Sequence, residues 1–308
     1  MKRIIFSIGL LTALISCEKD ITVDLPKGEQ KLVVEGTIEN GKPPVVILTK
    51  TIGYFEPADV NTLEGLFVHN TDVYVSDGNS KVKLQEFCTD NLPDSVKIAL
   101  AQAAGVPVEQ MFAINYCVYT TPSLIGQVGK TYTLEINAEG KFYSSITTIP
   151  PIVIPDSFYF KTQPGYDSLG YLWLHFTDPA NQTNFYRIFT QRKNKDSRFI
   201  PLTGSVYDDR FINGKTIDFY FVRGQEFNSQ KPDDQGEEAF YFKKGDTIYV
   251  KFCTIDNDSY DFWASYENEI YTAGNPFASP TTIKTNIKGG GLGVWCGYGV
   301  YIDTVYAR

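Results

Sequence analysis

The chain has 308 residues, a formal net charge of -8 and a hydrophobic content of 43%. This acidic balance without any basic run excludes a nucleic-acid-binding protein, because the phosphates of DNA and RNA require clustered Lys and Arg. The hydrophobic fraction is ample for packed cores. The length exceeds what one small domain needs, so we expect two domains.

The first 16 residues predict a lipoprotein signal peptide. A positive start, Met1 to Arg3, precedes an apolar run over residues 4–16, which is shorter than the roughly 20 residues that a membrane-spanning helix needs. The run ends in "LISC", which resembles the bacterial lipobox, whose cysteine is acylated and becomes the first mature residue. We expect Cys17 to carry acyl chains such as palmitate and residues 17–26 to form a tether. The alternative is an ordinary signal peptide with a chance cysteine.

The residues after the anchor indicate where the protein is displayed. Glu18-Lys19-Asp20 resembles a short charged signal that sends some Bacteroidota lipoproteins through the outer membrane. We therefore expect a lipid-anchored protein of the outer membrane at the cell surface. The periplasmic face is the alternative.

Residues 27–149 predict a β-sandwich-like, Ig-like domain. Its apolar runs flank Asn40-Gly41, Asp77-Gly78 and Glu139-Gly140, dipeptides that favour hairpin turns because they tolerate positive φ. Paired runs of this kind are typical of an antiparallel sandwich. One helical insertion is expected in "PDSVKIALAQAAG", with Asp94 as N-cap and a glycine as stop.

The proline-rich "IPPIVIPDS" marks the domain boundary, and residues 150–308 predict a second β-sandwich-like domain. Alternating runs such as "GYLWLHF" and "DTIYVKF" indicate its strands. Its helical insertion is expected near residues 259–273, where aromatic residues recur at three-and-four spacing. The fold class is therefore mainly β, with two sandwich-like domains and one short helix in each.

Four cysteines besides Cys17 predict two disulfides, because an even number in an exported chain favours bridges. They are Cys88, Cys117, Cys253 and Cys296. Three pairings are open, and we favour 88 with 117 and 253 with 296, since each bridge then stays inside one domain.

No pattern in the chain predicts a catalytic or metal centre. His175 alternates with apolar residues on an expected strand, which is typical of a structural histidine, and His69 has no obvious nucleophile partner. The acid pairs Asp233-Asp234 and Glu237-Glu238 fall in a polar loop that we expect to be solvated, whereas glycosidase carboxylates need rigid placement. We expect no enzyme activity, no metal and no cofactor.

Two further motifs resemble ligand-binding loops only in part. Asp256, Asp258 and Glu267 match three positions of a calcium-binding EF-hand loop, but Asp261 stands where glycine is required, so capping of a helix by Asp258 is the simpler interpretation. The glycine-rich "KGGGLGVWCGYG" lacks the GK[ST] of a phosphate loop and leads into a strand. Its glycines predict close backbone approach or a bulge instead.

Several stretches together resemble a known family. They include "VDLP", "KLVVEGTIENGKPPVVILTKT", "FTDPANQTNFYRI" and, most specifically, "NPFASPTTIKTNIKGGGLGVWCGYG". The family comprises Bacteroidota outer-membrane lipoproteins classed as a domain of unknown function, often encoded beside a TonB-dependent receptor. The resemblance implies an envelope lipoprotein with a transporter as partner, and it supplies no catalytic residues.

Together these features predict a non-catalytic accessory lipoprotein that binds a TonB-dependent outer-membrane receptor or its ligand. A structural or assembly factor of the outer membrane is the runner-up, and a surface hydrolase of glycans or peptides is a third option. The candidate binding residues are Asn275, Pro276 and Phe277, with Phe277 as an exposed anchor. The alternative is that Phe277 packs under its loop.

Overall fold

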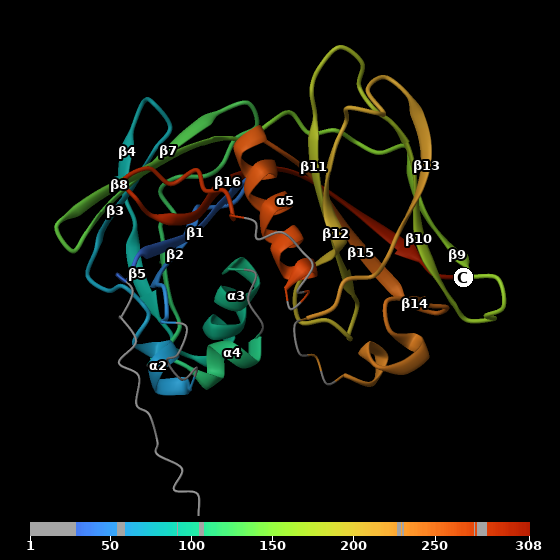
Figure 1. The fold of residues 1–308 in the computed structure, drawn as a ribbon, viewed down its shortest axis with the longest axis horizontal. Coiled ribbons are helices and arrows are strands. Elements are labelled where there is room, and N and C mark those ends of the chain that lie inside the picture. Colours follow the sequence, from blue (N-terminus) through green and yellow to red (C-terminus); the bar gives the residue numbers. More distant parts are fainter. Residues whose placement is uncertain are drawn as a thin grey trace, which may run out of the picture.

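The computed structural model describes residues 29–53, 59–90, 92–104, 108–226, 229, 231–273, 275 and 282–308. It confirms the mainly β fold, with 45% strand and 15% helix. The described strands form one large sheet and two small ones (Figure 1).

The large sheet has eight strands in the order β12-β11-β15-β16-β1-β2-β6-β5. Their bounds are β1 (Leu32–Glu39), β2 (Val45–Lys50), β5 (Gln85–Cys88), β6 (Cys117–Thr120), β11 (Phe185–Arg192), β12 (Ile200–Asp208), β15 (Thr247–Ile255) and β16 (Leu292–Tyr306). Strands from both halves of the chain therefore share one sheet.

Each half of the chain also contributes a small sheet of four strands. The N-terminal one, in the order β4-β3-β7-β8, consists of β3 (Asp72–Ser76), β4 (Lys81–Lys83), β7 (Thr131–Ala138) and β8 (Lys141–Thr148). The C-terminal one is built around β10 (Leu169–Thr177), which pairs with β9 (Ser157–Thr162), β13 (Thr216–Phe221) and β14 (Phe242–Lys243). In Figure 1 these two sheets lie at opposite ends of the molecule.

The three hairpin turns expected from the sequence are present. Glu139 and Gly140 adopt φ values of 52° and 76° between β7 and β8, as a tight two-residue turn requires. Gly41 and Gly78 also have positive φ, between β1 and β2 and between β3 and β4.

Strand β16 connects the two halves. Its first part pairs in parallel with β1, where Trp295 lies opposite Gly36, and its second part pairs antiparallel with β15. Trp295 belongs to the N-terminal core, whereas Val305 of the same strand belongs to the C-terminal core. The domain division at residues 149 and 150 stays a prediction, and the last strand of the chain contributes to both cores.

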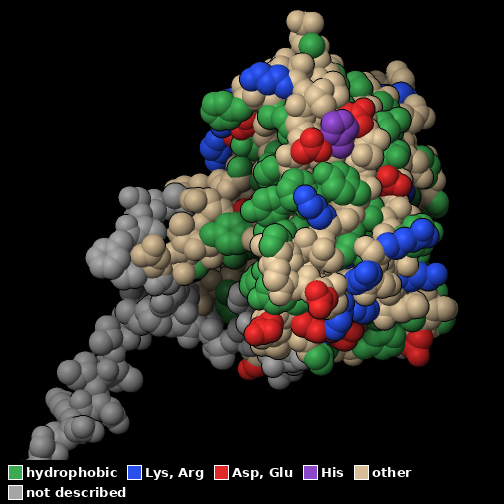
Figure 2. Space-filling model, turned by 90° about the vertical axis from the view of Figure 1, so that its right-hand side faces the viewer, with side chains coloured by type: hydrophobic (Ala, Val, Ile, Leu, Met, Phe, Trp, Pro, Cys, Tyr) green, Lys and Arg blue, Asp and Glu red, His purple; other side chains and the backbone are tan. Residues whose placement is uncertain are grey.

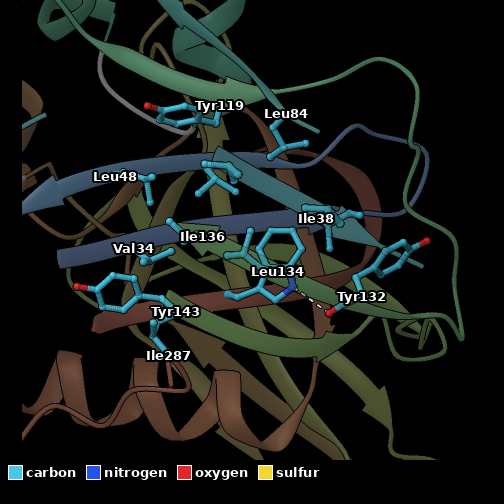
Figure 3. Packing of buried hydrophobic residues seen from close by; sticks show 14 of the residues in the cluster. Val34, Ile38, Leu48, Leu84, Tyr119, Tyr132, Leu134, Ile136, Tyr143 and Ile287 are labelled. Atoms are coloured by element: carbon cyan, nitrogen blue, oxygen red, sulfur yellow. Dashed lines mark hydrogen bonds between the residues drawn. The ribbon is translucent and has the colours of Figure 1, made fainter. Parts of the chain in front are cut away.

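The N-terminal core lies between the large sheet and the β4-β3-β7-β8 sheet. Figure 3 shows Val34 of β1 and Leu48 of β2 beside Leu134 and Ile136 of β7. Trp295 is fully buried among them, and its indole Nε1 donates a hydrogen bond to the Tyr132 carbonyl at 3.0 Å. Alternating apolar positions along these strands thus produce the two-layer packing that the sequence pattern predicted.

The helices of the described chain are α2 (Val60–Glu64), α3 (Asp94–Ala104), α4 (Val108–Ala113) and α5 (Asn257–Thr272), with 3-10 turns at Pro232–Asp234 and Gly236–Glu238. In Figure 1 the helices α3, α4 and α5 lie in the middle of the view, between the two small sheets, and α2 lies at the lower left. Helices α3 and α5 confirm the two expected insertions, whereas α2 and α4 were not predicted. No helix in the described part of the chain is long and apolar enough to cross a membrane.

One of the two predicted disulfides is present. Cys88 and Cys117 are bonded and lie directly opposite each other on β5 and β6, so the bridge closes the excursion that contains α3 and α4. The predicted Cys253–Cys296 bridge is wrong, because both thiols are free and buried. Cys253 lies opposite Val300 on β16, four residues from Cys296. At roughly 3.3 Å per residue, this offset exceeds the reach of a disulfide.

Candidate ligand-binding face

Most of the residues expected to anchor or bind lie outside the described residues. These are Cys17, Pro276 and Phe277. Asn275 is exposed just after α5, and its backbone N–H donates to the Thr272 carbonyl at 3.0 Å. The binding role of this loop stays a prediction.

The surroundings of His69 resemble a metal site but do not form one. His69, Glu86, Cys88 and Cys117 hold their ligand atoms within 4.8 Å of one another. The two sulfurs are joined in the disulfide and therefore cannot bind a metal as thiolates. What remains is one contact, His69 Nδ1 to Glu86 Oε1 at 2.6 Å.

The acidic loop before β14 is more ordered than the sequence suggested. We expected Asp233 and Asp234 to be solvated, but Asp234 is buried and forms an ion pair with buried Arg223 at 2.6 Å between Oδ1 and Nη1. Asp233 contacts Arg192 at 3.0 Å. These acids neutralise two buried guanidinium groups, which is a structural role.

The partial EF-hand is a helix cap. Asp256 caps α5, since its Oδ1 accepts the Ser259 N–H at 2.9 Å, so the cap lies two residues before the predicted Asp258. Glu267 accepts the backbone N–H of Ser205 at 2.9 Å. Asp256 and Glu267 therefore bind protein groups, which accounts for two of the three carboxylates of the motif.

The glycine-rich segment permits close backbone approach, as expected. Gly293 has a φ of 99°, and a Cβ there would lie 1.9 Å from the Val34 carbonyl oxygen. A side chain at this position would prevent β16 from pairing with β1.

The most distinctive surface is the outer side of the C-terminal small sheet. Tyr159 on β9, Trp173 on β10 and Tyr220 on β13 lie directly opposite one another across the three strands. Their rings contact in sequence, with centroids 6.1 Å apart for Tyr159 and Trp173 and 5.4 Å apart for Trp173 and Tyr220. Because side chains alternate along a strand, these three rings lie on the outer side of the sheet, where Tyr159 and Tyr220 are exposed and Trp173 is half-buried.

Three further rings extend this row. Tyr171 stands 4.8 Å from Tyr220 and 5.0 Å from Tyr241, and Tyr241 is 5.7 Å from Tyr166, all measured between ring centroids. We call the six residues Tyr159, Tyr166, Tyr171, Trp173, Tyr220 and Tyr241 the aromatic face. Figure 2 looks onto this side of the molecule and shows hydrophobic side chains gathered beside a histidine.

Polar groups border the aromatic face. Lys161 lies over the Trp173 ring at 5.2 Å, and His175 Nδ1 contacts Asp218 Oδ1 at 3.1 Å. A hydrogen bond to Tyr241, together with desolvation, raises the pKa of Tyr171 to about 12. Its phenol therefore keeps its proton at neutral pH and can take part in hydrogen bonds as a neutral group.

The sequence analysis missed this face. "GYLWLHF" showed the alternation of Trp173 and His175 with apolar residues, but it did not show which strands would lie beside it. The available signal was the same alternation in "SFYFK" and "IDFYF", each with a tyrosine in the outward phase. Only the register of β9 and β13 against β10 makes these residues neighbours.

A cavity of about 170 Å³ lies on the inner side of the same sheet. Its walls are apolar and include Leu174, Phe176 and Phe252. Phe211, which also lines it, is 81% exposed. Since Leu174 and Phe176 occupy the phase opposite to Trp173, the cavity is separate from the aromatic face.

The chain belongs to a family described as a domain of unknown function (DUF4249), which it matches over residues 18–301. A comparison with curated proteins found no match. Membership confirms the resemblance to a family of unknown function and assigns no role to any residue.

Proposed function

We propose that this member of the family is a non-catalytic, lipid-anchored protein of the outer membrane that assists a TonB-dependent transporter by binding its ligand. Its lipid anchor is Cys17, and it is displayed at the cell surface. The aromatic face carries this proposal, because six neighbouring rings, three exposed and three half-buried, offer a stacking surface that the cores do not require.

The placement of the aromatic face supports a role in capture. The described chain begins at Glu29, which forms an ion pair with Lys141 of β8 at 2.9 Å, in the N-terminal half. The aromatic face lies on the C-terminal small sheet, at the opposite end of the molecule (Figure 1). A tether near the first end would leave the second end free to meet a ligand.

The acid pair that we considered for catalysis has a structural role. Asp233 and Asp234 form ion pairs with the buried Arg192 and Arg223. His69 and His175 each contact one carboxylate, and neither contact places a nucleophile beside the imidazole.

Affinity purification of the lipidated protein from mildly solubilised outer membranes tests the proposal. Mass spectrometry should identify a stoichiometric TonB-dependent receptor, and deletion of the gene should impair uptake of one nutrient class. A protein that purifies alone, or a deletion that weakens the envelope regardless of nutrient, would contradict the transport role and favour a structural factor. Substrate turnover abolished by a single Asp or Glu substitution would instead indicate a hydrolase.

A further inference from the structure

We propose that the ligand of the aromatic face is a carbohydrate chain of low charge. This inference rests on the proposed function, since it names the class of ligand that the protein would capture. Its basis is the combination of ring geometry, side-chain composition and charge on the outer side of β9, β10 and β13.

The shape of the site favours an extended ligand. The six rings form a continuous row with centroid steps between 4.8 and 6.1 Å, on the outer surface of a sheet rather than inside a cavity. Small molecules are usually bound in concave sites that enclose most of their surface. An open row of rings instead suits a chain that contacts several rings in succession, as single-stranded nucleic acids do on other proteins.

The composition of the site favours sugar rings. Apart from Leu169, which is buried at the start of β10, every outward position on the three strands is aromatic or polar. These residues are Ser157, Tyr159, Lys161, Tyr171, Trp173, His175, Thr177, Thr216, Asp218 and Tyr220. A sugar ring has C–H groups on its faces and hydroxyls on its edge, so it can stack on aromatic rings and hydrogen-bond to their polar neighbours.

The charge of the site argues against strongly ionic ligands. Lys161 lies over Trp173, and Asp218 contacts both His175 and the Tyr159 hydroxyl, the latter at 3.4 Å. One cation and one anion therefore offset each other within the row. Polyphosphates and nucleic acids would need an excess of positive charge, which these positions do not provide.

The experiment measures binding of the full lipidated protein, held in nanodiscs, to soluble dextran, xylan, mannan and laminarin by affinity electrophoresis. At least one polysaccharide should retard the wild type. Trp173→Ala and Tyr220→Ala should each weaken that binding by about 5- to 150-fold, the loss seen when one stacking ring is removed. Trp173→Phe should restore much of it, because stacking needs a ring rather than the indole nitrogen.

Tyr74→Ala is the matched control. Tyr74 is a half-buried ring on the outer side of the N-terminal small sheet, covered by Lys81 at 4.8 Å. Its loss should leave binding unchanged.

Failure of the inference is distinguishable from failure of the proposed function. If no polysaccharide retards the wild type, or if Trp173→Ala binds as well as the wild type, the carbohydrate assignment is wrong. Recovery of the transporter from membranes would still support the proposed function in either case. If Trp173→Ala also loses the transporter while no polysaccharide binds, the aromatic face is a protein-docking surface.

Discussion

The two small sheets pack on the same large sheet, yet their outer surfaces differ. On the N-terminal sheet, Lys81 pairs with Glu135 and Lys83 with Asp72, both at 2.6 Å. Both lysines also lie over the half-buried Tyr74, and two exposed apolar side chains, Phe142 and Ile146, lie apart on β8 with Ser144 between them. The corresponding surface of the C-terminal sheet is the aromatic face, where Tyr220 alone is 45% exposed.

This difference shows that a clustered row of aromatic rings is not needed for a small sheet of this kind to fold on the large sheet. On the N-terminal sheet, cross-strand ion pairs cover part of the surface and the exposed apolar side chains stand singly. The C-terminal sheet instead gathers six neighbouring rings, of which Tyr159, Tyr166 and Tyr220 are 36–45% exposed and the others are half-buried. Because exposed rings add little to stability, this clustering is the observation on which our proposal of a binding role rests.

The two halves of the chain also stabilise their long interstrand segments by different interactions. The N-terminal excursion with α3 and α4 is closed by the Cys88–Cys117 disulfide. The C-terminal loop before β14 is held by buried ion pairs, with the Arg223 guanidinium also donating from Nε to the Tyr241 carbonyl at 2.5 Å. Reductant should therefore weaken one half and acid the other.

The largest expected effect distinguishes the fully buried Trp295 from the half-buried Trp173. Trp295→Ala should lower the free energy of unfolding by about 3–5 kcal/mol, because it removes a fully buried indole and its hydrogen bond to Tyr132. Trp173→Ala should cost less than about 1 kcal/mol. Chemical denaturation followed by circular dichroism measures both. If both variants lost the same free energy of unfolding, Trp173 would be a core residue like Trp295 and not part of a binding surface.

Removal of the disulfide should affect the N-terminal half alone. The bonded cysteines are 29 residues apart, so the Cys88→Ala, Cys117→Ala double variant should lose about 3–4 kcal/mol in the chain-entropy model. Denaturation with and without reductant checks this, since reductant should destabilise the wild type and not the variant. Ligand binding at the aromatic face should persist, and its loss would contradict the independence of the two surfaces.

The buried ion pair gives the C-terminal half its sensitivity to acid. Burial would raise the pKa of Asp234, but the Ser229 hydroxyl and the Arg223 guanidinium hold it below the ordinary value of 3.8. Such a carboxylate stabilises the fold fully above its unfolded pKa, and the contribution is lost as the pH falls through the folded pKa. Asp234→Asn should cost about 3 kcal/mol at neutral pH.

The pH profile tests the cause of that loss. The stability difference between the wild type and Asp234→Asn should shrink as the pH falls below about 4. Thermal denaturation across this range, compared with the disulfide variant, provides the readout. A difference that stays constant with pH would show that charge is not what stabilises the loop.

The smallest effect concerns the ion pairs of the N-terminal sheet. Lys81 is exposed, so Lys81→Ala should change the free energy of unfolding by less than about 1 kcal/mol. The change should diminish in high salt, because screening weakens exposed pairs. Denaturation at two salt concentrations measures it. A loss that salt leaves unchanged would show that Lys81 acts through packing over Tyr74.

Local signals predicted much of the fold. The hairpin turns, helices α3 and α5 and the Cys88–Cys117 bridge follow from short stretches whose turn chemistry, spacing or helical period is visible in the sequence. Long-range pairings were not predictable. The parallel pairing of β1 with β16 joins the two ends of the chain, and no residue in either strand specifies it.

The aromatic face was not predictable either, because it also depends on long-range strand pairing. Tyr159, Trp173 and Tyr220 are far apart in the sequence and meet only through the register of three strands. The bridge predicted between Cys253 and Cys296 failed for the same reason, since strand neighbours must also match in register. Asp234 was expected to be solvated because Arg223 and Arg192 are not visible as its neighbours in the sequence.

The most direct test of the central claim compares three altered strains of the native cell with the wild type. One lacks the protein, one carries Tyr159→Ala, Trp173→Ala and Tyr220→Ala together, and one carries Tyr74→Ala. Growth is measured on a panel of single carbon sources, with immunoblots of the outer membrane to confirm equal amounts of each variant. The account predicts that the triple variant shows the same nutrient-specific defect as the deletion, while Tyr74→Ala grows like the wild type. A triple variant that grows normally where the deletion fails would contradict a function for the aromatic face.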